Sequence, residues 1–251
     1  MGGTASSLRP EKRRAASAPP LQLRLLDAFE VVAAGEPVSL PAGAQRLVAF
    51  VALQGRPVQR DYVAGMLWLD TTDARAAANL RSMLWRIQKH ARGLIDAREQ
   101  RLRLQPNVSI DLRVAEDLAR RELAGTESAA ADLSALSSDL LPDWYEDWVL
   151  LERERFRQLR LRALEALCER QLRAGRIGAA LEAGLLSLAG EPLRESAHRA
   201  LVRVHLADGN AVEAVRQYRL CRRLLLEQLG VEPTRQLCEL VAGLDGMETG
   251  R

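Results

Sequence analysis

Apolar and polar residues alternate with period two at the start of the chain. Leu21–Leu25 reads Leu-Gln-Leu-Arg-Leu, Phe29–Val31 begins a second run, and the turn Gly35–Pro37 leads into a third run at Val38–Leu40. Because period two places every second side chain on one face of a strand, these runs predict a small antiparallel sheet of about three strands.

After Pro41 the hydrophobic spacing becomes that of amphipathic helices. Three helices are predicted in succession, at residues 45–53, 61–68 and 74–91, the first ending at Gly55 and the third capped by Asp73. The alternation then returns at residues 94–95, 102–104 and 108–110, with a charged turn at 98–101, which predicts a hairpin. A sheet, three helices and a hairpin in this order are typical of a winged helix-turn-helix.

The chain after Asp111 has helical spacing almost throughout. A helix is predicted from Val114 to Leu123, a long amphipathic helix from Trp144 to Arg173, and three or four more helices up to Leu244. Between the first two, Ala124–Ser138 is rich in alanine, serine and aspartate, so it is either an exposed loop or a weak helix.

This helical half contains an internal repeat. Residues 174–181 align with residues 208–215 at an offset of 34 residues, which is the period of tetratricopeptide repeats. Pro192 and Pro233 are each expected to start the next helix, where a missing N–H costs nothing. The second copy carries extra residues before its proline, so the repeat is imperfect.

These patterns predict a fold that is mainly α with a small β component. Residues 21–112 are expected to form a winged-helix domain with an N-terminal sheet, and residues 113–246 an all-α domain with repeat-type packing. Residues 1–20, rich in Ala, Ser, Arg and Pro, are expected to be a disordered basic tail, and residues 247–251 a second tail.

The composition adds little about partners but more about location. The net charge is +3, and nearly all of the 36 basic residues are arginine, which binds phosphate and guanine well but is also enriched by a GC-rich coding genome. The first 20 residues lack the apolar core of a signal peptide, and no run reaches the roughly 20 apolar residues of a membrane span. We therefore expect a cytoplasmic protein without membrane contact.

Enzymatic and metal-binding motifs are missing from the sequence. It contains no phosphate-binding loop, dinucleotide fingerprint, HExxH or GxSxG motif. Its three cysteines are far apart, with no CxxC pair, and His198 and His205 share a helix face without a third ligand. We expect no catalytic activity, no cofactor and no metal site.

The predicted third helix has two contrasting faces. An apolar stripe with spacings of three and four is expected to be buried, and it consists of Ala77, Leu80, Leu84, Ile87 and Ala91. The other faces carry the candidate DNA-binding side chains, which are Arg75, Asn79, Arg81, Ser82, Arg86 and Lys89. Arginine reads guanine, asparagine pairs with adenine, and serine or lysine holds phosphate. A lone basic helix would be explained as a solvated face; its place third among three helices, before an arginine-tipped hairpin, favours DNA recognition.

The hairpin supplies a candidate wing of Arg98, Arg101 and Arg103. Arginines at such a tip reach the minor groove or the DNA backbone. For Arg103, an outward position on an alternating strand is the simpler explanation. Two tryptophans near apolar stripes, Trp68 and Trp85, are predicted to pack in the core instead of stacking on bases.

Two segments of the long predicted helix are also unusual. The cluster Trp144–Trp148 is interpreted as an aromatic anchor at the start of the helix, with direct contact to a partner as the alternative. The run Glu152–Arg155, together with Arg157, is interpreted as a charged helix face.

Several motifs, in order, resemble the Streptomyces antibiotic regulatory protein family in its short form. The resemblance covers residues 21–245 and is carried by Leu-Arg-Leu-Leu at 23–26, Phe29–Val31, Pro41–Leu47, Ala-Asn-Leu-Arg-Ser-Met-Leu-Trp-Arg at 78–86, Leu-Pro-Asp-Trp-Tyr-Glu-Asp-Trp at 141–148, Glu191–His198 and Gln217–Tyr218. It implies an OmpR-type winged helix joined to a bacterial transcriptional activation domain with tetratricopeptide-like packing. By position, the recognition role falls on Asn79, Arg81, Ser82, Arg86 and Lys89, and the wing on residues 98–103.

The resemblance also implies a function and partners. Family members are sequence-specific activators that bind direct repeats in the promoters of secondary-metabolite, often antibiotic, biosynthesis genes. They bind double-stranded DNA as head-to-tail dimers and recruit RNA polymerase through its sigma factor and neighbouring subunits. Larger relatives append an ATPase module, and since this chain stops at Arg251, nucleotide-driven control is not expected. Two alternatives remain open, a protein-interaction adaptor of the repeat type and a repressor with the same fold.

Overall fold

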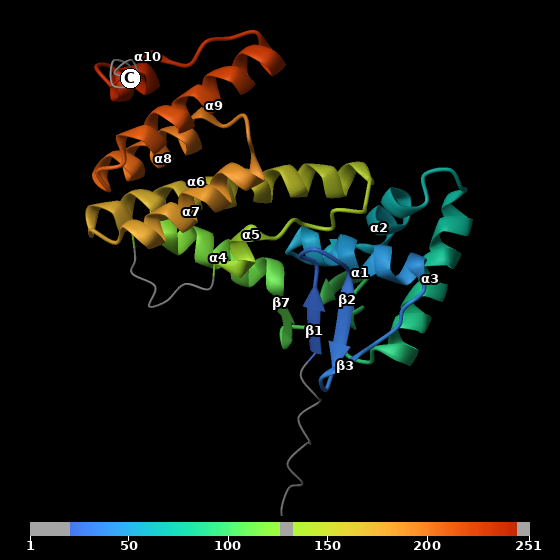
Figure 1. Ribbon diagram of the computed structural model, residues 1–251. Helices are drawn as coiled ribbons and strands as arrows, with labels where there is room; N and C mark the ends of the chain where they lie inside the picture. Colours follow the sequence, from blue (N-terminus) through green and yellow to red (C-terminus); the bar gives the residue numbers. More distant parts are fainter. Residues whose placement is uncertain (1–20, 126–132, 245–251) are drawn as a thin grey trace, which may run out of the picture.

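The computed structural model of the chain describes residues 21–125 and 133–244 (Figure 1). Below, the N-terminal part means residues 21–110 and the C-terminal part means the described residues from 111 onward. The tails predicted at residues 1–20 and 247–251 lie outside the described residues, as does the middle of the segment Ala124–Ser138.

A four-stranded sheet opens the N-terminal part, in the order β3-β2-β1-β7. Its strands are β1 (Leu21–Arg24), β2 (Glu30–Ala33), β3 (Glu36–Pro37) and β7 (Val108–Ile110). The first three are antiparallel, as predicted, although the third lies just before the predicted run at Val38–Leu40. The prediction that residues 108–110 extend a hairpin is wrong, because β7 pairs in parallel with β1.

Asp111 holds the end of β7 beside the end of β1. Its carboxylate accepts hydrogen bonds from the backbone N–H groups of Leu25 at 2.9 Å, Leu26 at 3.0 Å and Leu112 at 2.7 Å. Burial raises the pKa of this carboxyl, although the three N–H donors act in the opposite direction. Asp111, which is 86 residues away from Leu25 in sequence, thus fixes the register of β7 against β1.

Three helices and a smaller sheet complete the N-terminal part. The helices are α1 (Ala42–Gln54), α2 (Arg60–Leu67) and α3 (Asp73–His90), and the strands, in the spatial order β4-β6-β5, are β4 (Val58–Gln59), β5 (Ile95–Asp96) and β6 (Arg101–Leu104). α1 ends where predicted, at Gly55, whose φ of +63° is accessible to glycine.

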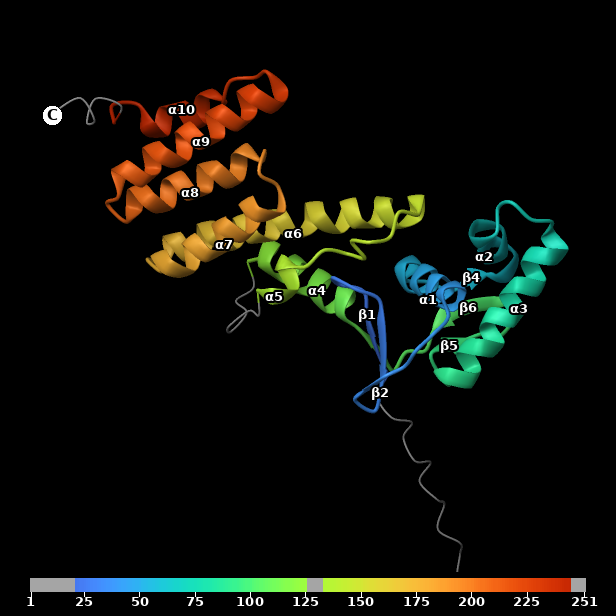
Figure 2. The same cartoon turned by 45° about the vertical axis from the view of Figure 1, so that its right-hand side comes forward.

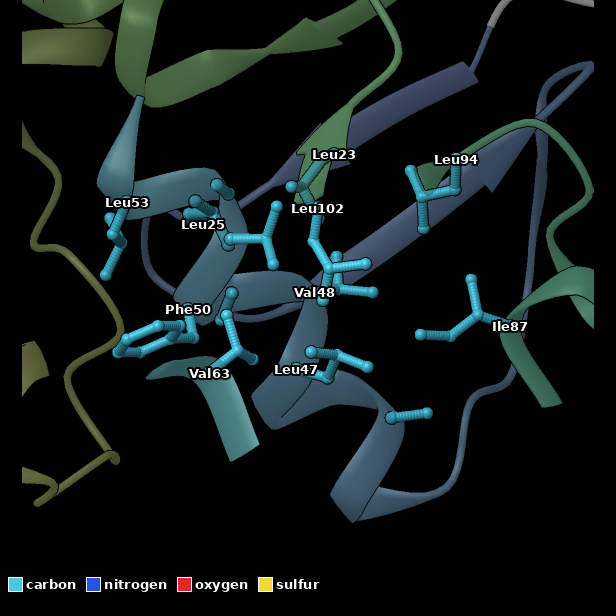
Figure 3. Close-up of a cluster of buried hydrophobic side chains, with 14 of the residues drawn as sticks. Leu23, Leu25, Leu47, Val48, Phe50, Leu53, Val63, Ile87, Leu94 and Leu102 are labelled. Atoms are coloured by element: carbon cyan, nitrogen blue, oxygen red, sulfur yellow. The ribbon is translucent and has the colours of Figure 1, made fainter. Parts of the chain in front are cut away.

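The core of the N-terminal part surrounds α1. Figure 3 shows side chains from both sheets and all three helices converging there, with Leu47, Val48 and Phe50 from α1 facing Val63 of α2 and Ile87 of α3. These five side chains are almost completely buried. Since α1 contacts α2, α3 and β6, it positions the last two helices and the β5–β6 hairpin relative to one another.

The C-terminal part is all helical. It contains α4 (Asp111–Leu123), α5 (Ser134–Ser137), α6 (Asp147–Arg173), α7 (Ile177–Gly190), α8 (Glu195–Ala207), α9 (Ala211–Leu229) and α10 (Arg235–Val241). Neighbouring helices stack in sequence order, α6 on α7, α7 on α8 and α8 on α9 (Figures 1 and 2). Within the described residues, no helix is long and apolar enough to cross a membrane.

The predicted repeat corresponds to the turns before α7 and α9, at Gly175 and Gly209, which both have positive φ. Close packing follows at Gly184 and Gly190 of α7, where an added Cβ would lie 2.7 Å from Leu201 and Leu161, respectively. These glycines therefore allow α7 to approach its two neighbours.

The two prolines do not start helices, contrary to expectation. α8 begins at Glu195 and α10 at Arg235, so Pro192 and Pro233 lie in the preceding turns. The carbonyl oxygen of Pro192 instead accepts a hydrogen bond from His198 Nε2 at 2.9 Å.

Residues 138–148, called the strap below, connect α5 to α6 and pack against the N-terminal part. Leu141 N–H donates to the carbonyl of Leu25 at 2.9 Å, and Leu140 forms an antiparallel bridge with Leu26. The strap and the first turns of α6 share one hydrophobic cluster with α1 and β1. The two parts of the chain therefore have a common core.

Aromatic side chains fill this junction, as the anchor interpretation of residues 144–148 predicts. Trp144 stacks on Phe29 with ring centroids 5.8 Å apart, and Trp148 meets Phe50 edge to face at 5.2 Å. Tyr145, between them, is 78% exposed.

Arg153 is not part of an exposed charged face, contrary to the interpretation of residues 152–157. Its guanidinium donates to the backbone carbonyls of Leu140, Leu141 and Trp144. These carbonyls belong to a segment without regular secondary structure, so they need donors from elsewhere. One arginine thus satisfies three carbonyls of the strap.

Replacing Trp148 by alanine should destabilise the whole chain. The indole fills the junction but is only half-buried, so we expect a loss of about 2 kcal/mol, below the roughly 3–5 kcal/mol of a fully buried aromatic. Urea unfolding measures the change. Tyr145→Ala, at the exposed neighbouring position, is the control, and equal losses for the two variants would contradict the packing argument.

His198 is completely buried between α8 and α9. Its Nε2–H donates to the carbonyl of Pro192, and its Nδ1 accepts a hydrogen bond from Gln217 Nε2 at 2.7 Å. Both ring nitrogens of the neutral imidazole are therefore satisfied, and a proton on Nδ1 would remove the acceptor that Gln217 needs. Burial lowers the pKa of His198 below its ordinary value of 6.5.

Stability should therefore fall as the pH decreases below about 6.5, because the unfolded chain binds the proton more readily than the folded chain. We expect the free energy of unfolding, measured in urea at pH 7.5 and 5.5, to depend less on pH in His198→Gln. The same substitution at the exposed His90 is the control for the loss of an imidazole. A His198→Gln variant with the full pH dependence would show that another group is responsible.

Candidate nucleic-acid interface

α3 lies along the edge of the N-terminal part that faces away from α7–α10 (Figure 2). Its buried line consists of Ala76, Leu80 and Ile87, while Leu84 is half-buried. Ala77 is half-buried too, so the predicted stripe is displaced by one residue at its N-terminal end.

The buried side of α3 packs against α1. A Cβ added to Gly43 of α1 would lie 3.0 Å from the sulfur of Met83, so α3 approaches α1 closely at this point. α3 also packs against α2 and β5, so its exposed face lies on the side away from these three elements.

The candidate side chains of α3 divide into two groups. Arg75, Arg81, Ser82, Arg86 and Lys89 are exposed, whereas Asn79 is half-buried at the margin of the core. The three arginines form no ion pair within the described residues. Asp73, at the first position, is the sole acidic residue of α3, so the exposed face is strongly positive.

Most arginines of the C-terminal part are used differently. They form ion pairs with carboxylates of the helices and of the turns between them, among them Arg113–Glu116, Arg120–Asp117, Arg157–Glu154, Arg194–Glu165, Arg216–Glu213, Arg222–Glu232 and Arg235–Glu239. Such pairs neutralise the surface locally. On α3, by contrast, all three arginines are exposed and none forms an ion pair within the described residues.

Trp85 does not pack in the core, contrary to the prediction. Its side chain is 64% exposed, and the Lys89 ammonium lies 5.3 Å from the centre of its ring. At about 100° per residue, its place two residues before Ile87 turns it to the opposite side of the helix. Trp68, by contrast, is half-buried against the core, as predicted.

The β5–β6 hairpin follows α3 directly. Glu99 and Gln100 form its turn with positive φ values of 52° and 59°, and Arg101 N–H closes the turn on the carbonyl of Arg98 at 2.9 Å. A hydrogen bond from Arg60 N–H to the carbonyl of Gln100, also 2.9 Å long, ties the turn to the start of α2. The hairpin tip is thus fixed relative to the three helices.

The three candidate wing arginines have different surroundings. Arg103 donates two hydrogen bonds to Asp96, at 3.0 and 3.2 Å, whereas Arg98 approaches the same carboxylate at 3.4 Å. Asp96 is 7% exposed, and it lies directly opposite Arg103 in the strand register. Arg101 is exposed and has no ion pair within the described residues. Asp96 was not predicted from the sequence, although a cross-strand pairing of β5 with β6 could have identified it.

Comparison with known proteins identifies the C-terminal part. A family model for the bacterial transcriptional activator domain matches residues 110–244. Regulatory protein AfsR from Streptomyces griseus is 27% identical over 210 residues, and that from Streptomyces coelicolor is 28% identical over 220 residues, which are 77% and 82% of this chain. The chain spans 21% and 22% of the length of these two relatives.

A solved structure has the same fold. Mycobacterium tuberculosis EmbR, in complex with a low-affinity phosphopeptide, superposes with a TM-score of 0.65 at 20% identity, covering 89% of this chain and 64% of that chain. Together with the family match over more than half of the residues, these similarities establish a relationship that the motifs had suggested. The chain belongs to the bacterial transcriptional activator domain family, and it is similar to regulatory proteins of the Streptomyces antibiotic regulatory protein type.

Proposed function

We propose that the chain is a sequence-specific DNA-binding transcriptional activator. In this proposal, residues 21–112 form an OmpR-type winged helix-turn-helix, with α3 as recognition helix and the β5–β6 turn as wing, and residues 113–246 form the activation domain. The observation that carries the proposal is the exposed face of α3, whose three arginines are unpaired while most arginines of the C-terminal part are neutralised.

The chemistry of α3 suits the major groove of DNA. The groove is about 12 Å wide and admits one helix, and an arginine such as Arg86 can donate two hydrogen bonds to guanine O6 and N7. Asn79 can pair with adenine, while Ser82 and Lys89 can hold phosphates on either side. The wing would add Arg98 and Arg101 at the minor groove or the backbone.

The proposed partners follow from the family relationship. The chain would bind direct repeats of double-stranded promoter DNA as a head-to-tail dimer, upstream of secondary-metabolite biosynthesis genes, in the cytoplasm. Its activation domain would recruit RNA polymerase, including the sigma factor. The shared core at the strap supports this arrangement, because it holds the activation domain in a defined position relative to α3.

Binding and transcription assays test the proposal. Gel shifts use the full chain and duplexes from the upstream regions of its neighbouring genes, and we expect complexes that depend on sequence and weaken with salt. Without any such complex at micromolar protein, the adaptor alternative would be favoured. In vitro transcription with RNA polymerase holoenzyme should yield more transcript when the chain is added, whereas less transcript would indicate a repressor.

Arg86→Ala should weaken binding to a selected site by about 1–3 kcal/mol if the guanidinium contacts a base. Fluorescence anisotropy on that site and on a random duplex of equal length measures the loss. Arg235→Ala, at an exposed arginine of α10, should bind like the wild type. An equal loss on both duplexes would mean that Arg86 contacts phosphate.

Substitutions of Arg101 and Arg103 should have different effects in the same binding assay. Arg101→Ala removes an unpaired charge, so binding should weaken similarly on all duplexes, and the slope of log K against log salt should decrease by about 1. Arg103→Ala leaves the buried Asp96 carboxylate without its closest partner, so we expect a loss of thermal stability as its main effect. A larger change in salt slope for Arg103→Ala than for Arg101→Ala would contradict this assignment.

A further inference from the structure

Of the four tryptophans in the sequence, Trp85 is the one that does not pack against the hydrophobic core. Trp68, Trp144 and Trp148 pack against the core cluster of the N-terminal part, whereas Trp85 does not belong to it. With 64% of its surface exposed, Trp85 keeps a large apolar ring in water. Such exposure is unfavourable for folding, so it calls for an explanation outside the folded chain.

The surroundings of Trp85 indicate what it meets. Ala78, Ser82 and Lys89 are exposed on the same side of α3, because they lie seven residues before, three before and four after Trp85. The ammonium of Lys89 lies over the ring, and Arg86 follows it directly in sequence. An apolar ring bordered by cations, on a face without carboxylates, is complementary to a polyanion that also presents apolar groups.

We propose that Trp85 is a specificity-determining residue that contacts the C5-methyl groups of thymines in the DNA major groove. The proposal rests on the proposed function, in which α3 lies in that groove. Among the base edges of the major groove, the thymine methyl is the apolar group, whereas the other exposed groups are hydrogen-bond donors and acceptors. Apart from its single N–H donor the indole is apolar, so its ring carbons suit this methyl better than they suit the donors and acceptors of the groove.

The contact with Lys89 prepares Trp85 for this role. A cation over the face of the ring restricts the rotamers of both side chains, so less entropy is lost when the ring meets DNA. Burying one methyl group corresponds to about 0.8 kcal/mol, which is about a fourfold change in affinity for each thymine contacted.

The test compares thymine with uracil, which lacks only the methyl group. The full chain first selects a binding sequence from random duplexes, and each thymine of that sequence is then replaced singly by deoxyuridine. For the wild type, at least one replacement should lower affinity about fourfold. In Trp85→Ala, affinity for the thymine duplex should be lower, and the same replacement should change it less than twofold.

A matched control separates this effect from the loss of any exposed apolar side chain. Leu151, on α6, is 70% exposed, so Leu151→Ala should retain the full thymine preference. Thermal unfolding should be similar in the wild type and both variants, because neither side chain is part of the core.

Three results would overturn the inference. One is a Trp85→Ala variant that keeps the thymine preference, and another is a variant that loses affinity equally on thymine, uracil and random duplexes, which would make Trp85 a backbone contact. The third is a wild type that is indifferent to uracil at every position although it selects a sequence. If the wild type selects no sequence at all, the proposed function fails, and this inference fails with it.

Discussion

The need to satisfy the backbone of the strap is the constraint on which the rest of the structure depends. Residues 138–148 run from the end of α5 past the first sheet to the start of α6, and most of them lie outside regular secondary structure. Arg153 supplies hydrogen bonds to three of their carbonyls, and Trp144 and Trp148 supply the apolar contacts with Phe29 and Phe50. Without these interactions, polar backbone would be buried without partners, and the two parts would have separate cores.

Arginine has opposite electrostatic roles in the two parts of the chain. In the C-terminal part, carboxylates three or four residues away, or on the next helix, neutralise most guanidinium groups. On α3 they remain unpaired, so their charge extends into solvent and attracts anions from a distance. The small net charge of the whole chain, +3, therefore conceals an uneven distribution.

Local patterns in the sequence predicted the elements better than the contacts between them. Hydrophobic period and turn residues located the three helices, the hairpin and the 34-residue repeat, because these features depend on neighbouring residues. The parallel partner of β7 and the role of Arg153 were missed, because they depend on contacts between residues distant in sequence or outside regular structure. Trp85 was placed wrongly because it lies next to the apolar stripe in sequence, whereas helical phase turns its side chain to the exposed side.

The candidate site could be located from sequence, but its electrostatics could not. Asp96 and Arg103 face each other only after β5 pairs with β6, so the sequence alone left the charge of the wing undefined.

The strap also limits how this architecture can be recombined. A family match that begins at residue 110 suggests an exchangeable module, yet the contacts of Trp144 and Trp148 reach back to Phe29 and Phe50 on the other side of that boundary. A chimera joined at this point would bring together aromatic surfaces from different proteins. Substitutions in these aromatic side chains on one side of the boundary therefore require matching substitutions on the other side. The two parts of the chain are expected to evolve together for this reason.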